Sequence, residues 1–284
     1  YYNLKEYRSA LVDLNKVLIS DTGLIEAYLY RGLVHQHLNN YTFAEGDMDH
    51  YISRKPADES ALLCRAGLHN DMEEYLKEVQ DYDAYLEMHP TEAAVISYRA
   101  NAWNELDSFD KSLNDYNTCI RLEPVNYQYV LGKGNLYFDF EKYTEAIDQY
   151  NLYLLTDPSN KEARLNRADA KLNSKQSEDA LEDYALLVAA EPQNGDYLFY
   201  RGFCYMQLSA DTASNLFSNY SALAEKDFSA ALDNGYRDIP KILLFRGLVR
   251  NNLSHNPEAC MDFKKSAELG NKEAKDYFLK NCGE

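Results

Sequence analysis

The sequence has few positively charged residues compared with its acidic ones. Its 284 residues carry 29 Lys and Arg against 46 Asp and Glu, a formal net charge of −17. Nucleic acids and anionic membrane surfaces both attract basic proteins, so neither is an expected partner. No apolar run approaches the roughly 18 residues that a membrane-spanning helix needs, and we expect no direct insertion into a membrane.

Cysteine and catalytic motifs are also scarce. The five cysteines include no C-x-x-C pair, which disfavours a zinc ribbon or a redox motif. The chain has no G-x-S-x-G, no glycine loop for phosphate and no H-E-x-x-H. We therefore predict no enzyme: no catalytic residue, no metal site and no cofactor. Hydrophobic residues make up 45% of the chain, which nevertheless predicts a folded protein.

What the sequence does contain is an internal repeat. Five of its seven prolines are spaced by 34 residues: Pro56, Pro90, Pro124, Pro158 and Pro192. Such regularity indicates a repeated structural unit rather than chance composition. With each proline counted as position 32, small residues recur at position 8 (Gly32, Ala66, Ala100, Gly134, Ala168, Gly202) and at position 20 (Ala10, Ala44, Ser112, Ala146, Ala180, Ala224). Large residues recur at position 24: Leu14, Met48, Tyr82, Tyr116, Tyr150, Tyr184, Phe228 and Phe263.

Each unit predicts two helices. The apolar spacing of the first half is helical, a polar turn follows near positions 14 to 17, and the proline ends the second helix. Small residues at positions 8 and 20 let the two helices approach closely. Fifteen of the 25 tyrosines fall at positions where the unit packs on itself. Because one helix pair cannot bury its apolar face alone, neighbouring units must stack.

This pattern resembles the tetratricopeptide repeat family, over nearly the whole chain. The resemblance implies an all-α fold, a right-handed superhelix of about seven and a half repeats in one solenoid. Glu78 departs from it by occupying a small position 20, which puts the helix contact of its unit in doubt. The expected divisions are a partial repeat 1–24, repeats 25–58, 59–92, 93–126, 127–160 and 161–194, an insertion-bearing repeat 195–239, a last repeat 240–273 and a capping helix 274–284.

A pair of opposite charges accompanies nearly every unit. Position 7 is Arg or Lys in Arg31, Arg65, Arg99, Lys133, Arg167, Arg201 and Arg246, and position 23 is Asp except at Gln149. The unit that lacks Arg at position 7 is the one that lacks Asp at position 23. We predict one bidentate Arg–Asp contact per repeat that fixes the two helices in register. His35 and His69 share position 11, in the packed layer, which favours burial over metal binding.

The resemblance also implies a binding groove. In this family, positions 2, 5, 9, 12 and 13 of the first helices line a concave face. In the central repeats these are Asn101, Asn104, Glu105, Gln128, Leu131, Asn135, Phe138, Asp139, Glu162, Leu165, Asp169 and Asn173. The surface is rich in amides and acids, and amides both donate to and accept from a peptide backbone. An ordinary solvated helix face is the alternative.

Charge selects among possible ligands. Some relatives that bind chaperones grip a terminal carboxylate with basic residues at positions 2 and 5, where this chain has almost none apart from Lys241. A neutral or basic protein segment suits the predicted groove better.

Two further features lie near the end of the chain. In the insertion, Leu216, Phe217 and Tyr220 have no place in the repeat pattern; they either lengthen a helix and pack on a neighbour or form an apolar patch for a partner. Cys260 and Cys282 stand apart from the other cysteines. The last repeat resembles that of cell-envelope proteins of Gram-negative bacteria, which implies a disulfide between them and a periplasmic or envelope location.

The expected function is therefore binding, by a non-enzymatic scaffold that holds a protein segment. The alternatives are a regulatory or targeting domain of a larger enzyme, since the repeat pattern begins inside a unit at Tyr1, and a purely architectural spacer.

Overall fold

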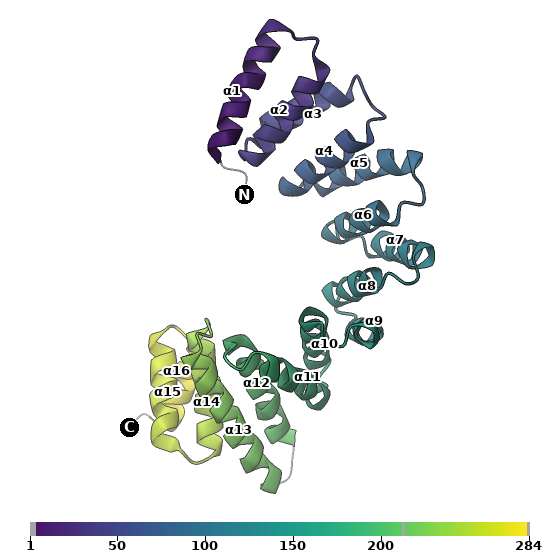
Figure 1. The fold of residues 1–284 in the computed structure, drawn as a ribbon. Helices are drawn as coiled ribbons and strands as arrows, with labels where there is room; N and C mark the ends of the chain where they lie inside the picture. The colour runs from purple at the N-terminus through teal and green to yellow at the C-terminus, as the bar shows by residue number, and fades with distance from the viewer. Residues whose placement is uncertain (1–3, 212–213, 283–284) are drawn as a thin grey trace. The chain divides into compact units, whose positions relative to one another are not determined.

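The protein is built from helices alone in the part that the structure describes. The computed structural model describes the backbone of residues 4–211 and 214–282, and the side chains of residues 6–210 and 217–282. Within these ranges no strand occurs, which confirms the all-α prediction (Figure 1). The helices are α1 (Leu4–Ser20), α2 (Ile25–His37), α3 (Tyr41–Ile52), α4 (Glu59–Asp71), α5 (Tyr75–Met88), α6 (Ala93–Glu105), α7 (Phe109–Leu122), α8 (Gln128–Asp139), α9 (Tyr143–Thr156), α10 (Lys161–Asn173), α11 (Ser177–Ala190), α12 (Gly195–Asp211), α13 (Ser214–Asp233), α14 (Ile239–Asn252), α15 (Asn256–Glu268) and α16 (Lys272–Asn281).

The helices follow the sequence period in pairs. The pairs run from α2–α3 to α14–α15, with α1 in the place of a second helix and α16 after the last pair. The first helix of each pair begins within one residue of a predicted repeat boundary, whereas α16 begins two residues before the predicted cap. None of the described helices is both long enough and apolar enough to span a lipid bilayer.

The chain divides into two compact units, Tyr1–Leu136 and Tyr137–Glu284. Helices that follow one another in the chain pack together from α1 to α7 in the first unit and from α9 to α16 in the second. In the first unit, α4 and α6 lie on one side and α5 and α7 on the other (Figure 1). First helices and second helices therefore form two layers, as stacked helix pairs must in order to bury their apolar faces.

The turn inside six of the helix pairs has an unexpected backbone conformation. Six non-glycine residues have φ between 51° and 64°, and all occupy position 15: Asn39, Glu73, Asp107, Glu141, Lys175 and Ser254. The following residue donates its N–H to a carbonyl five residues back, as from Glu74 to His69 at 2.8 Å. This is the Schellman pattern that ends helices, here without the glycine that usually adopts it.

Small residues mark the places where helices approach most closely. A Cβ added to Gly247, at position 8 of α14, would lie 2.6 Å from a ring carbon of Phe263 on α15. A Cβ on Gly132 would lie equally close, 2.6 Å, to the ring of Tyr116. Such distances do not occur between real atoms, so these positions admit only glycine unless the aromatic ring moves.

The predicted Arg–Asp contacts are confirmed. In Arg99, Nε and Nη2 each donate to Asp115, both at 2.8 Å. Asp115 is almost fully buried, and the guanidinium beside it is about one quarter exposed. The same bidentate pair joins the two helices in Arg31–Asp47, Arg65–Asp81, Arg167–Asp183, Arg201–Asp227 and Arg246–Asp262.

A second contact of the same side chain was not predicted. Nη1 of Arg99 donates to Asp83 of the preceding repeat at 2.7 Å. Equivalent bonds of 2.7–2.9 Å join Arg31 to Asn15, Arg65 to Asp49, Lys133 to Asn117 and Arg167 to Asn151. Each partner lies 16 residues before the base, at position 25. One guanidinium thus links three helices, and we call this arrangement the position-7 clamp.

Glu78 does not disturb its helix pair. The side chain is 3% exposed, accepts hydrogen bonds from Asn70 Nδ2 at 3.3 Å and from Tyr82 Oη at 3.1 Å, and lies between α4 and α5, which pack normally. Burial raises the pKa of this carboxyl because the charged form is desolvated. The sequence put the contact between these two helices in doubt because a glutamate stands at a small position. The hydrogen bonds from Asn70 and Tyr82 explain how the carboxyl is accommodated there.

The first prediction concerns the position-7 clamp. Arg99→Ala should lower the free energy of unfolding by about 3 kcal/mol, because it leaves the buried carboxylate of Asp115 without its partner. Lys133→Ala is the matched control: it removes a base at the same position that donates to the neutral, exposed Asn117, and should cost less than about 1 kcal/mol. Denaturant unfolding followed by circular dichroism measures both variants, and equal losses would contradict the clamp.

The second prediction concerns Glu78. A carboxyl whose pKa is raised on folding binds its proton more tightly in the folded state, so stability falls as pH rises from the unfolded pKa to the folded pKa. Glu78→Gln cannot titrate and should be more stable than the wild type by about 1 kcal/mol at pH 7, with the gain vanishing below pH ~4. Melting temperatures from pH 4 to 8 test this. Glu87→Gln, on the exposed side of α5, should show no such pH dependence.

Candidate functional site

The predicted groove residues of the first unit centre on α6. Asn101 and Glu105 are exposed and Asn104 is half-buried. Tyr98, whose exposed fraction is 51%, lies three residues before Asn101 and seven before Glu105, so the three side chains share one stripe of the helix. The sequence analysis missed Tyr98; its place at position 6, outside the packing positions, was the available signal.

Asn101 has a structural partner as well as an exposed edge. Its side-chain oxygen accepts a hydrogen bond from the hydroxyl of Tyr116, on α7. The bond joins position 9 to position 24 within one repeat. A ligand would therefore meet an amide whose orientation is already fixed, which lowers the entropy lost on binding.

The residues on α8 differ in their access to solvent. Gln128 and Asp139 are exposed, while Asn135 and Phe138 are half-buried. The division between the two units falls within α8, so Gln128 and Asn135 belong to the first unit and the other two to the second. Phe138 meets the ring of Tyr143 edge-on at 5.6 Å.

Leu131 requires a correction. It was predicted to line the groove, but its exposed fraction is 7%. Tyr129 and Val130 beside it are buried as well, because the first turn of α8 is enclosed on most sides by packing. Leu131 is a core residue and has little surface to offer a ligand.

In the second unit, α10 carries a comparable stripe. Glu162, Leu165, Asp169 and Asn173 follow helical spacing along one face, and the first and last are exposed. Leu165 packs against the core cluster around Tyr184. Asp169 accepts a hydrogen bond from the Tyr184 hydroxyl, and burial raises the pKa of this carboxyl. Position 9 is thus again bonded to position 24, as in Asn101–Tyr116.

The charge of these faces follows from the position-7 clamp. Arg99 on α6 and Arg167 on α10 are both held by aspartates of second helices. The exposed carboxylates Glu105 and Glu162 remain on the stripes. Each stripe therefore carries an exposed carboxylate and an exposed amide, Glu105 with Asn101 on α6 and Glu162 with Asn173 on α10.

The insertion lengthens both helices of its pair. α12 has 17 residues and α13 has 20, against 12 to 14 in the other complete pairs. Phe217 and Tyr220 are half-buried, and the ring of Tyr220 stacks at 6.0 Å on that of Tyr205. Packing of Tyr220 on the neighbouring helix supports the first of the two interpretations. The side chain of Leu216 lies outside the described residues.

The predicted cysteine pair is joined in the structure. Cys260 on α15 and Cys282 after α16 form a disulfide, with their Cα atoms 5.6 Å apart. The bridge holds the last helix against the repeat that it covers. The other cysteines are free thiols; Cys119 and Cys204 are fully buried and Cys64 is half-buried.

Comparison with known proteins supports the resemblance seen in the sequence. Residues 101–162 match the model of the tetratricopeptide repeat. No curated protein matches the chain.

Solved structures share its fold. A tetratricopeptide repeat protein from Parabacteroides merdae is 20% identical with a TM-score of 0.62, and the match covers 90% of this chain and 97% of that one. The C-terminal part of a repeat protein from Cytophaga hutchinsonii is 13% identical, with a TM-score of 0.70 and coverage of 87% and 98%. YrrB, described as a repeat protein with an unusual peptide-binding site, is 16% identical, with a TM-score of 0.58 and coverage of 70% and 97%. At these identities the likeness concerns the fold, and it confirms the tetratricopeptide resemblance.

The disulfide gives a testable prediction. Cys282→Ser should lower the stability of the last repeat by about 3 kcal/mol, the chain-entropy value for a loop with a sequence separation of 22. Hydrogen exchange should become faster in α15 and α16, while α10 and α11 keep their protection. Peptide mapping without reductant measures the bond directly. Two free thiols in the native protein would contradict the bond. They would also count against the periplasmic or envelope location expected from the sequence, since disulfides persist in oxidising compartments.

Proposed function

We propose that the protein is a non-enzymatic scaffold that binds a neutral or basic protein segment along the first helices of its repeats. In the first unit the binding stripe consists of Tyr98, Asn101 and Glu105 on α6. The observation that carries this proposal is the exposure of these three side chains on one helix face.

The three side chains offer complementary contacts to a peptide. An exposed tyrosine supplies a large contact area with few rotatable bonds, and tyrosine is enriched among residues that dominate binding energies. The amide of Asn101 can pair with a peptide backbone, and the carboxylate of Glu105 can pair with a basic side chain. The ring of Tyr98 is 6.1 Å from that of Tyr82, which limits its motion before a ligand arrives.

Electrostatics favour a basic over an acidic segment. The chain has a net charge of −17, and Arg99, the arginine of α6, is bound to Asp115 and Asp83. An acidic ligand would have to displace one of these carboxylates, whereas a basic ligand approaches a complementary potential. The peptide-binding site of YrrB, a protein of the same fold, supports binding of this general kind.

Selection from a displayed peptide library on the intact chain tests the proposal. Selected peptides should be rich in Lys and Arg, and their affinity should fall with added salt. Glu105→Lys and Tyr98→Ala should each weaken binding at least ~10-fold, since an interface anchor contributes about 2 kcal/mol.

Matched controls come from the second helices of the same unit. Glu87→Lys reverses an exposed charge on α5, and Phe43→Ala removes an aromatic ring on α3 whose exposed fraction is 68%. Both should bind the selected peptides as the wild type does. Equal losses in the controls, or selection of acidic peptides, would refute the assignment of the α6 stripe.

A further inference from the structure

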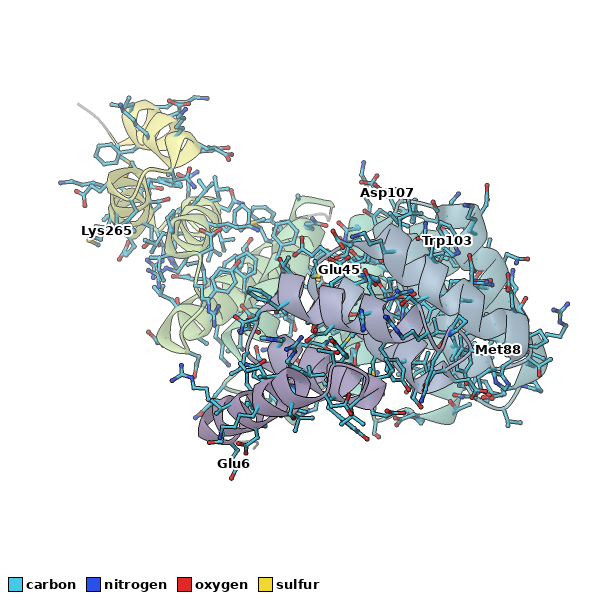
Figure 2. The ribbon with its side chains drawn as sticks, turned by 90° about the horizontal axis from the view of Figure 1, so that it is seen from above. Glu6, Glu45, Met88, Trp103, Asp107 and Lys265 are labelled. Carbon is cyan, nitrogen blue, oxygen red and sulfur yellow. A yellow bond between two sulfur atoms is a disulfide. The ribbon has the colours of Figure 1, made fainter. Side chains whose placement is uncertain are left out.

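Three potential metal ligands from three helices meet in the first unit. They are Glu45 on α3, His69 near the end of α4 and Glu74 at the start of α5 (Glu45 is labelled in Figure 2). One nitrogen or oxygen atom from each residue lies within 4.8 Å of the other two. This cluster lies outside the α6 stripe, and it borders the position-7 clamp of Arg65 through the contact of His69 with Asp81.

His69 is buried and oriented toward the two glutamates. Its exposed fraction is 4%, and its Nδ1 lies 3.0 Å from Oδ2 of Asp81. Asp81 is held in turn by Arg65, whose Nε donates at 3.1 Å. The opposite nitrogen, Nε2, makes no hydrogen bond; Oε1 of Glu45 is 3.5 Å away. Metal-binding histidines have this arrangement, with a carboxylate behind the ring and the other nitrogen directed at the ion.

The turn after α4 brings the third ligand into place. Glu73 has a φ of 58°, so the chain reverses at once and the N–H of Glu74 donates to the carbonyl of His69 at 2.8 Å. Glu74, the N-cap residue of α5, therefore lies beside the last turn of α4.

The repeat itself does not require these residue types. In the next repeat the equivalent positions hold Val79, Trp103 and Ser108, and in the preceding one Leu11, His35 and Asn40. Neither of these repeats has a carboxylate at the three positions. Among the described residues, only this cluster brings an imidazole and two carboxylates together as potential metal ligands, and it holds a buried nitrogen that makes no hydrogen bond.

A cationic group already occupies the space between the glutamates. The ammonium of Lys77 lies 2.7 Å from Oε1 of Glu45 and 2.8 Å from Oε2 of Glu74. Its side chain is 46% exposed, so it can turn out to solvent without leaving a buried charge. A divalent cation in its place would balance both carboxylates, which one ammonium does not.

We propose that Glu45, His69 and Glu74 bind a divalent transition cation of the zinc class, with solvent completing the coordination. Zinc takes nitrogen and oxygen ligands at about 2.0–2.2 Å, and the three ligand atoms already lie within 4.8 Å of one another. An imidazole among the ligands favours zinc and its neighbours over calcium or magnesium. Lys77 competes with the cation for the same two carboxylates. The site is independent of peptide binding by α6.

Titration of the chelator-treated full chain with Zn²⁺, followed by calorimetry, tests the proposal. The wild type should bind one equivalent, and Glu45→Gln and Glu74→Gln should each weaken binding at least ~10-fold. Lys77→Met should tighten binding, because it removes the competing charge; a merely structural cluster would not respond in this direction. Circular dichroism should show that both Gln variants remain folded, so His69→Gln, which alters a buried group, is not needed for the decision.

His89→Gln is the matched control. His89 also faces a carboxylate, with Nε2 2.7 Å from Oε1 of Glu59, but it belongs to no cluster of three ligands among the described residues. It should leave zinc affinity unchanged. Absence of stoichiometric binding, equal affinity in Glu74→Gln, or a loss in the control would overturn the site. With Co²⁺, thiolate charge-transfer absorption would assign the metal to Cys64 instead and would also overturn it.

Discussion

The stacking of helix pairs depends on the base at position 7, which is a guanidinium in every repeat except that of Lys133. In Arg99, two bonds join it to a buried aspartate of its own second helix, and a third joins it to the second helix of the repeat before. Hydrophobic packing would allow neighbouring pairs to slide, since apolar contact has no preferred direction. Directed hydrogen bonds to charged groups do not allow this. The clamp therefore sets register within a repeat and between repeats at the same time.

The clamp also decides which charges remain for a ligand. The position-7 arginines of the first helices are bound by aspartates, while carboxylates such as Glu105 and Glu162 stay exposed on the same helices. An acidic face is then a by-product of the way the repeats are joined. The tyrosines at position 24 have a similar double effect: Tyr116 and Tyr184 fill the core and orient Asn101 and Asp169 at the surface.

Much of this arrangement was predictable from the sequence, and the exceptions have physical causes. The period of 34 residues and the pairing of Arg99 with Asp115 are visible because both residues recur at fixed positions. The third bond of the clamp was not visible in the sequence, because its acceptor at position 25 is Asn in some repeats and Asp in others. The left-handed turns were hidden because no glycine marks position 15. Leu131 was assigned to the wrong environment because position 5 lies at the edge between groove and core. The cluster at His69 combines residues from three separate segments of the chain, and no regular spacing in the sequence predicts that they meet.

Burial of the free cysteines bears on how the disulfide is acquired. Desolvation raises the pKa of both Cys119 and Cys204 to about 12, so almost none of either is ionised at neutral pH. Thiol–disulfide exchange requires a thiolate that attacks a disulfide sulfur. A thiol enclosed in a packed core is also unable to reach that sulfur. Once the repeats have formed, Cys64 is the one free thiol that is not fully buried and could attack the Cys260–Cys282 disulfide. Burial raises the pKa of Cys64 as well. Oxidative folding of this chain is therefore guided to one pairing by the same dense packing that stacks the helices.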